Sequence, residues 1–446
     1  MDNTTTAIAR FASSLRYEQI PSNVSHAAKQ RLVDSLACAI GGYNCDAARI
    51  GRRVAKHVEP GSYTGRVLGF GEWTTAESAA FINTAMVRYL DFNDAVHGGH
   101  PSDALGGILA VAPALNKSGK QVLTALVVAY EIITRLITAT GFRERGWDQG
   151  FAIGIGSAAG HCSLLGLSQE ATANAVAIAA INVPLRAARA GNLSIWKGAA
   201  TAHACRDGVF AAELAAEGMT GPEATFEGRH GLFEQITGEF TLEPLGDNFR
   251  TPNVGMKYWP VENTAQASVW AALDIKKRYA LDDIETIDIA TSWAAWHEIG
   301  SEPAKWDPQS RETADHSLPY IFARALVDGT VNVETFEPQK YLDPKLRPIM
   351  AKIQVREDPE ISKVNPGTVI NLVTVTLKSG AKETVKIVNP RGHMKNLMDD
   401  HDTDTKFLNL AESVFGKARA TQMLETLWSL DNSADVLPVF KLFDLG

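Results

Sequence analysis

The sequence has little cysteine, no long hydrophobic run and no excess of positive charge. Among its 446 residues only four are cysteine, and no two of them form a C-x-x-C motif: Cys38, Cys45, Cys162 and Cys205. This spacing argues against a disulfide framework, a structural zinc site or an iron–sulfur cluster, and it favours a reducing compartment. The net charge of −8 makes nucleic acid or an anionic membrane a poor partner. An anionic ligand would therefore have to be bound by a local group of cations.

The longest apolar stretch, residues 122–130, ends at Glu131 and is shorter than the ~20 residues that a membrane span requires. The first 16 residues show no apolar segment typical of a signal sequence. With 45% hydrophobic and 21% charged residues, the composition is that of an ordinary globular chain. We expect a cytoplasmic protein of two or three domains, at roughly 100–200 residues per domain.

The first part of the sequence favours helices rich in small residues. Expected helices, with caps at Ser22 or Asn23, at Thr74 with Glu77, and at Ser102, cover 22–42, 76–90, 102–115 and 122–138. Residues 154–182 contain many Ala and Gly and few charges. Because small side chains let helices approach closely, we expect this stretch at the buried centre of a helical domain.

The pattern changes after about residue 268. Four segments have the alternation or composition of strands, and the last two flank a turn: 284–291, 352–357, 368–377 and 383–388. Helical segments at 265–279, 319–328 and 405–430 accompany them. The sequence therefore predicts a mostly α fold, with a large all-helical domain (1–267 with 400–446) and a smaller α+β domain (268–399).

The stretch Asp-Phe-Asn-Asp…Gly-His-Pro-Ser-Asp gathers acid–base groups. Asp91 and Asp94 are three residues apart and would share a face at a helix end. His100 precedes the helix start expected at Ser102, where free backbone N–H groups attract a carboxylate. These groups suit general acid–base catalysis. A simpler interpretation is a capped loop; a metal site that adds His97 matches no standard spacing.

Lys197 is a lone cation at the start of a helix of small residues. If that helix packs inward, the ammonium group is poorly solvated and would pair with a substrate carboxylate or stabilise a developing carbanion. Arg186 and Arg189 lie just upstream and would either add to this cationic group or form surface ion pairs. The simpler interpretation of Lys197 is a surface lysine.

Two later motifs contain further polar candidates. In Asp315-His-Ser-Leu-Pro-Tyr320, Ser317 is expected to cap a helix and Tyr320 to donate a hydrogen bond to an oxyanion. The alternative is a capping cluster with a half-buried tyrosine. In Lys257-Tyr-Trp-Pro-Val-Glu262, the ionisable candidate at the aromatic–proline turn is Glu262.

No cofactor motif is complete. The G-x-G-x-x-A pattern at 154–159 follows no expected strand. The acidic segment at 400–404 lacks the glycine and the glutamate of a calcium loop. We therefore expect neither a cofactor nor a metal ion.

Taken in order, the motifs resemble those of the MmgE/PrpD family: Asp-Phe-Asn-Asp…Gly-His-Pro-Ser-Asp, Ser-Ile-Trp-Lys-Gly, Tyr-Trp-Pro-Val-Glu and Arg-Glu-Thr-Ala-Asp-His-Ser-Leu-Pro-Tyr. The likeness runs from residue 20 to about residue 407 and is closer to the dehydratase branch. The family includes 2-methylcitrate dehydratase, cis-aconitate decarboxylase and iminodisuccinate epimerase. The resemblance implies a helical domain, an α+β lid domain with a cleft between them, a homodimer, and catalysis without a metal or iron–sulfur cluster.

The resemblance also assigns roles to individual residues. It implies that Asp91, His100 and Lys197 are active-site residues and that Tyr320 is a further pocket residue. We therefore expect Asp91, His100 and Lys197 to be catalytic, and we expect the substrate to be bound by Asp94, Ser102, Glu262 and Tyr320. Departures from the family pattern at Ala95, Asn263 and Thr264 fall near these positions and leave the substrate open.

The expected function is that of a hydro-lyase (dehydratase) on a small di- or tricarboxylate such as 2-methylcitrate, in propionate metabolism. A base removes a proton α to a carboxylate and an acid assists departure of the β-hydroxyl. Whether His100 or Asp91 is the base stays open. The alternatives are decarboxylation or epimerisation on the same scaffold, and a non-catalytic carboxylate-binding dimer.

Overall fold

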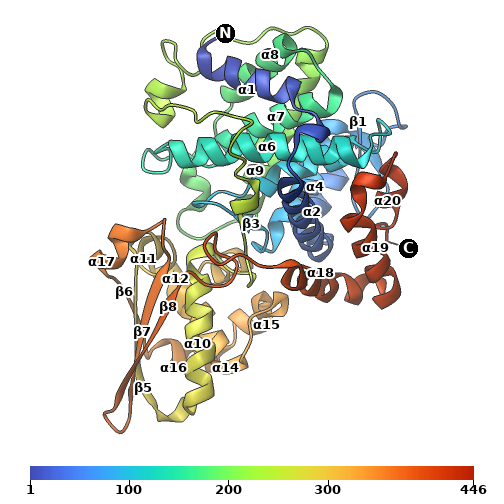
Figure 1. Ribbon diagram of the computed structural model, residues 1–446. Coiled ribbons are helices and arrows are strands. Elements are labelled where there is room, and N and C mark those ends of the chain that lie inside the picture. The colour runs from blue at the N-terminus through green and yellow to red at the C-terminus, as the bar shows by residue number, and fades with distance from the viewer. Residues whose placement is uncertain (446) are drawn as a thin grey trace. The chain divides into compact units, whose positions relative to one another are not determined.

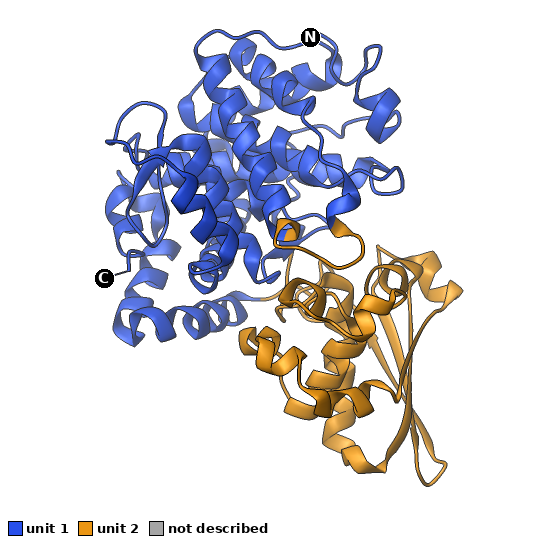
Figure 2. Cartoon of the chain, turned by 180° about the vertical axis from the view of Figure 1, so that it is seen from behind, with its two compact units in different colours: residues 1–188, 198–254, 399–446 blue, residues 189–197, 255–398 orange. Residues whose placement is uncertain are grey.

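The computed structural model describes residues 1–445 and divides into two compact units (Figures 1 and 2). Unit 1 comprises Met1–Ala188, Gly198–Val254 and the residues from Asp399 on, and unit 2 comprises Arg189–Lys197 and Gly255–Met398. The fold is mostly helical, at 57%, with a mixed sheet in the C-terminal half, as the sequence predicted. The domain boundaries expected from the sequence, 1–267 with 400–446 for one domain and 268–399 for the other, stay a prediction.

Unit 1 consists mainly of helices around one large hydrophobic core and a smaller apolar cluster, and it also contains three very short strands. Its elements are α1 (Asn3–Ser14), α2 (Ser22–Gly42), α3 (Asp46–Val54), β1 (Thr64–Arg66), β2 (Trp73–Thr75), α4 (Ala76–Tyr89), β3 (Asp94–Ala95), α5 (Leu105–Val111), α6 (Gly119–Ala139), α7 (Gly150–Leu165), α8 (Gln169–Ala180), α9 (Trp196–Ala216, whose first two residues belong to unit 2), α18 (Asp400–Phe415), α19 (Lys417–Trp428) and α20 (Leu437–Lys441).

Helix α6 forms the middle of this core. It is 21 residues long and apolar enough to cross a membrane, longer than the apolar stretch expected from the sequence, but 89% of its most apolar window is buried inside the protein. The charges that interrupt it are paired, since Arg135 Nη1 lies 2.5 Å from Glu131 Oε2. Glu131 also accepts hydrogen bonds from the backbone N–H groups of Arg250 and Thr251, at 2.9 and 2.8 Å. The buried carboxylate thus binds a distant segment of the chain to a core helix.

Glycines let α7 and α9 approach closely. A Cβ atom at Gly208 would lie 2.4 Å from Gly154 O and 2.8 Å from Ser157 Cβ, well inside van der Waals contact. Nearly all of α7 is buried, which confirms the expectation for the first part of the stretch 154–182. Residues 166 and 168–170, which follow α7, are exposed.

Replacing Gly208 by alanine is expected to lower the free energy of unfolding by about 1–3 kcal/mol. The overlap with the α7 backbone outweighs the ~1 kcal/mol that alanine gains over glycine in a helix. Gly154→Ala is the matched control, because its new Cβ would meet its nearest neighbour, Ala204 O, at an ordinary 3.4 Å. Urea denaturation followed by circular dichroism compares the two, and equal midpoints would contradict the packing argument.

Unit 2 is built on a four-stranded sheet with the strand order β6–β5–β7–β8. Strand β5 pairs parallel to β6 and antiparallel to β7, and β7 pairs antiparallel to β8. Helices α10 and α14 pack on each other and against the sheet, α10 on β7 and β8 and α14 on β6 (Figure 1). Along β7 the buried side chains are Asn371, Val373 and Val375, every second residue, as expected for a half-buried strand.

The expected strands and hairpin of unit 2 are confirmed. Its elements are β4 (Gly255–Met256), α10 (Gln266–Arg278), β5 (Ile284–Thr291), α11 (Trp293–Ile299), α12 (Pro303–Trp306), α13 (Arg311–Ala314), α14 (Leu318–Asp328), α15 (Pro338–Tyr341), α16 (Arg347–Met350), β6 (Ile353–Glu357), α17 (Pro359–Val364), β7 (Ile370–Leu377) and β8 (Lys382–Val388).

Two helices begin one residue away from the caps expected from the sequence. In α2 the N-cap is Pro21, and Ser22 is already helical. Pro21 has φ −56° and ψ 147°, an extended conformation that the fixed φ of proline allows. Helix α4 has Thr75 as its N-cap, so the capping box expected from Thr74 and Glu77 is wrong. Instead the Thr75 hydroxyl donates to Glu77 Oε1 at 2.7 Å.

Candidate functional site

Asp91 lies in the turn that follows α4 in unit 1. Its φ is +49°, which is uncommon for a residue other than glycine. Arg88 Nη1 donates to Asp91 Oδ1, and Arg88 Nε lies 3.7 Å from Asp103 Oδ2, with all three side chains buried. The spacing of Asp91 and Asp94 predicted that they share a helical face, and this prediction is wrong. Helix α4 ends before Asp91, and Asp94 belongs to β3.

Asp94 holds the segment that carries His100. Its Oδ1 accepts hydrogen bonds from Ser102 N at 3.1 Å and from Ser102 Oγ at 2.5 Å. Ser102 was expected to cap a helix but lies inside a short 3₁₀ turn, Pro101–Ala104, whose N-cap is His100. Asn93, which the sequence reasoning missed, donates to Ser102 Oγ at 2.8 Å. The capped-loop interpretation therefore holds for the Asp94 carboxylate.

The ring of His100 has a defined orientation. Its Nδ1 lies 2.5 Å from the backbone carbonyl of Asp94, and its backbone N donates to Gln149 Oε1 at 2.7 Å. A carbonyl oxygen can only accept, so Nδ1 carries the proton of the neutral ring and Nε2 carries the lone pair. His100 is thus held as an oriented acid–base group.

The Asp94 carboxyl titrates near neutral pH. Burial raises its pKa to about 7, with a smaller upward contribution from the nearby Asp34 carboxylate and an opposing effect of the hydrogen bonds from Ser102. Asp34 in turn lies 2.6 Å from Lys406 Nζ. A buried carboxyl that exchanges its proton in this range is typical of functional sites, although structural ionic clusters show the same shift.

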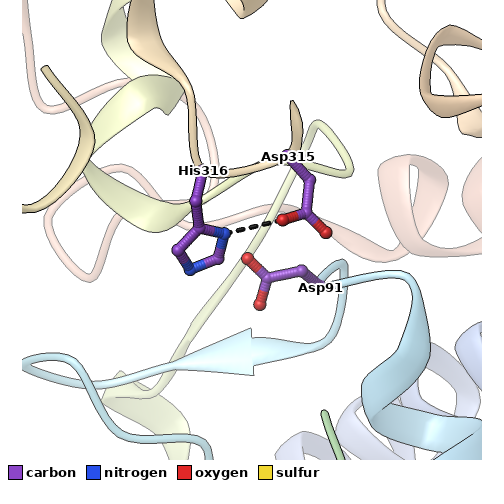
Figure 3. Close-up of side chains that lie close together, drawn as sticks. All are labelled: Asp91, Asp315 and His316. Atoms are coloured by element: carbon purple, nitrogen blue, oxygen red, sulfur yellow. Dashed lines mark hydrogen bonds and ion pairs between the residues drawn. The ribbon is translucent and has the colours of Figure 1, made fainter. Parts of the chain in front are cut away.

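In unit 2 a buried lysine, aspartate and histidine form a second cluster. Lys197 Nζ donates to both carboxylate oxygens of Asp315, at 2.9 and 3.2 Å, and both side chains are almost fully buried. His316 Nδ1 lies 2.7 Å from Asp315 Oδ1 (Figure 3, which also draws Asp91 of unit 1). The interpretation of Lys197 as a surface lysine is wrong, because the start of α9 is buried at this position.

The other two expected residues of unit 2 differ in their surroundings. Glu262 is half-buried and accepts a hydrogen bond from Thr264 N at 2.6 Å, and its own backbone N donates to Asp315 O at 3.0 Å. Tyr320 is fully buried in the core of unit 2, not half-buried, and its hydroxyl donates to Thr335 O. Ser317 caps α14 as expected.

Sequence reasoning passed over two buried lysines of unit 2. Lys257 and Lys305 are 3% and 1% exposed, and burial lowers the pKa of Lys305. Both stand next to aromatic residues in the sequence, Lys257 before Tyr258 and Lys305 before Trp306. This aromatic neighbour is the sequence feature that could have indicated that the two lysines are buried.

These observations define a two-unit, mostly helical protein in which each unit carries buried acid–base side chains. Comparison with known families makes the class specific. Residues 6–245 match the MmgE/PrpD N-terminal domain and residues 259–431 match the MmgE/PrpD C-terminal domain. The chain belongs to the MmgE/PrpD family.

Similar proteins cover almost the whole chain. A 2-methylcitrate dehydratase of Escherichia coli (strain K12) is 29% identical over 97% of this chain and 95% of its own length. An alkylcitrate dehydratase of a fungal species is 30% identical over 83% of this chain and 80% of its own length. A cis-aconitate decarboxylase-like protein of Aspergillus oryzae is 26% identical over 99% of this chain and 97% of its own length. The relatives thus include both dehydratases and a decarboxylase-like protein.

Proposed function

We propose that this protein is a hydro-lyase that removes water from a small tricarboxylate of the alkylcitrate type, with 2-methylcitrate as the first candidate. The observation that carries the proposal is the oriented His100, whose Nδ1 is held by Asp94 O and whose Nε2 is the basic nitrogen. The similarity to the E. coli 2-methylcitrate dehydratase over nearly the full length supports the same reaction class.

In the proposed mechanism a base takes the proton α to a carboxylate, and an acid protonates the departing β-hydroxyl. His100 and Asp91 supply proton-transfer groups, and Lys197 stabilises the negative charge that develops on the adjacent carboxylate. Asp94, Ser102 and Glu262 position the substrate. For Tyr320 the proposal requires the hydroxyl to exchange the Thr335 carbonyl for a substrate oxygen.

The second candidate is decarboxylation of a related acid, which the similarity to the A. oryzae decarboxylase-like protein favours. Epimerisation would begin with the same proton transfer. A protein that only binds carboxylates would need none of these steps. We also propose that the protein is a cytoplasmic homodimer that works without a metal ion.

A panel of citrate, 2-methylcitrate, cis-aconitate and related acids, followed by proton NMR, tests the function. We expect a new vinyl or methylene signal and loss of water from 2-methylcitrate, at an unchanged rate after treatment with EDTA. Evolved CO₂ would indicate a decarboxylase, and a change in optical rotation alone would indicate an epimerase. Thermal stabilisation by a ligand without any product would indicate a protein that only binds carboxylates. Light scattering after gel filtration measures the oligomeric state.

A further inference from the structure

We propose that His316 is the base that removes the carbon-bound proton, and that Asp315 positions its ring. The inference rests on the proposed function and makes one step of it specific, because the family resemblance and the sequence reasoning gave no such role to either residue.

The carboxylate of Asp315 is fixed from several sides. Its Oδ1 lies 2.9 Å from Lys197 Nζ and 2.7 Å from His316 Nδ1, and its side chain is 1% exposed. Its backbone is fixed as well, because the N–H donates to Arg311 O and the carbonyl accepts from Glu262 N, both at 3.0 Å. A carboxylate held in this way has little freedom to turn, so it determines the direction of the imidazole ring bonded to it.

The hydrogen bond to Asp315 also determines the tautomer of His316. An ionised carboxylate can only accept, so Nδ1 carries the proton and Nε2 carries the lone pair. This is the arrangement that orients a histidine base in hydrolytic triads, where the aspartate also stabilises the imidazolium that forms. Lys197 Nζ donates to both carboxylate oxygens of Asp315 and holds the group in place. The His316 side chain is 8% exposed, against 1% for Asp315, so the ring is the more accessible member of the pair.

The step balances as follows. The C–H bond α to the substrate carboxylate breaks, and Nε2 of His316 takes the proton. The electron pair of that bond forms the new C=C bond as the C–O bond to the β-hydroxyl breaks. The hydroxyl group takes a proton from the acid and leaves as water. His316 then holds one additional proton and the acid holds one fewer, and exchange with solvent restores both.

His316→Asn is the principal test. The asparagine amide can still donate a hydrogen bond to Asp315 but provides no base. We expect both dehydration of 2-methylcitrate and exchange of its α-hydrogen with D₂O, read by NMR, to fall by about 10²–10⁴-fold, with KM changed less than about threefold. The limb of the pH–kcat/KM profile that reports the base should disappear. In His316→Gly, added imidazole should restore part of the exchange, which a purely structural role would not allow.

His297→Asn is the matched control, because His297 is an exposed histidine of the same unit, stacked on Trp293 at 4.6 Å. It should keep wild-type rates. A folded His316→Asn enzyme with wild-type exchange and dehydration would overturn the inference while leaving the proposed function intact. If the wild-type protein converts no acid of the panel, both fail. Should His316→Asn not fold, His316→Gln takes its place in the same assays.

Discussion

Replacement of Lys197 by alanine should lower kcat/KM by about 10²–10³-fold and also destabilise unit 2. The activity falls because Lys197 is the cation proposed to stabilise the developing charge, and removal of one such group from a preorganised site has this effect. Stability falls because Asp315 would keep a buried carboxylate without its ammonium partner. Breaking one side of a buried pair costs about 3–5 kcal/mol. Steady-state kinetics and thermal unfolding measure the two effects.

A second substitution separates them. In Lys197→Ala/Asp315→Asn the buried negative charge is removed too, so most of the stability should return while the activity does not. Lys197→Arg keeps the charge and should retain the fold. If the double variant regained wild-type kcat/KM, both the proposed role of Lys197 in catalysis and the proposed role of Asp315 in positioning His316 would be wrong, and the two residues would form a structural pair only.

The fold was predictable where the pattern was strong and local. The hairpin of β7 and β8 followed from two strand-like runs around a Gly-containing turn, and the buried α7 followed from its small residues. The helix starts were less predictable. The N-cap of α2 is Pro21 and not Ser22, and the N-cap of α4 is Thr75 and not Thr74. Such one-residue choices depend on side-chain geometry that spacing does not encode.

The sequence predicted which residues belong to the candidate site better than it predicted the contacts that these residues make. Asp91, Asp94 and His100 are close in the sequence, yet the sequence suggested a shared helical face in place of a turn with positive φ. The pairing of Lys197 with Asp315 joins residues that are 118 positions apart. No periodicity links such positions, so this contact and the role we propose for His316 required the tertiary structure.

The stability of the protein should fall as pH rises because of Asp94. Its pKa in the folded protein is about 7, whereas an unfolded aspartate has a pKa of about 3.9. Between these values the folded state binds a proton that the unfolded state has lost, so stability from this group is complete below about pH 4 and is lost as pH rises through 7. Three pKa units correspond to about 4 kcal/mol.

Asp94→Asn removes this titration while its amide oxygen can still accept the hydrogen bonds from Ser102. Relative to wild type, the variant should therefore gain about 4 kcal/mol in free energy of unfolding between pH 4 and pH 8, measured as the difference between urea denaturation curves at each pH. Asp247→Asn, which removes an exposed carboxylate of unit 1, is the control for the loss of one charge. If Asp94→Asn followed the wild-type pH dependence as closely as Asp247→Asn does, Asp94 would have to be ionised in the folded protein throughout this range, and its burial would not be the cause of any pH dependence.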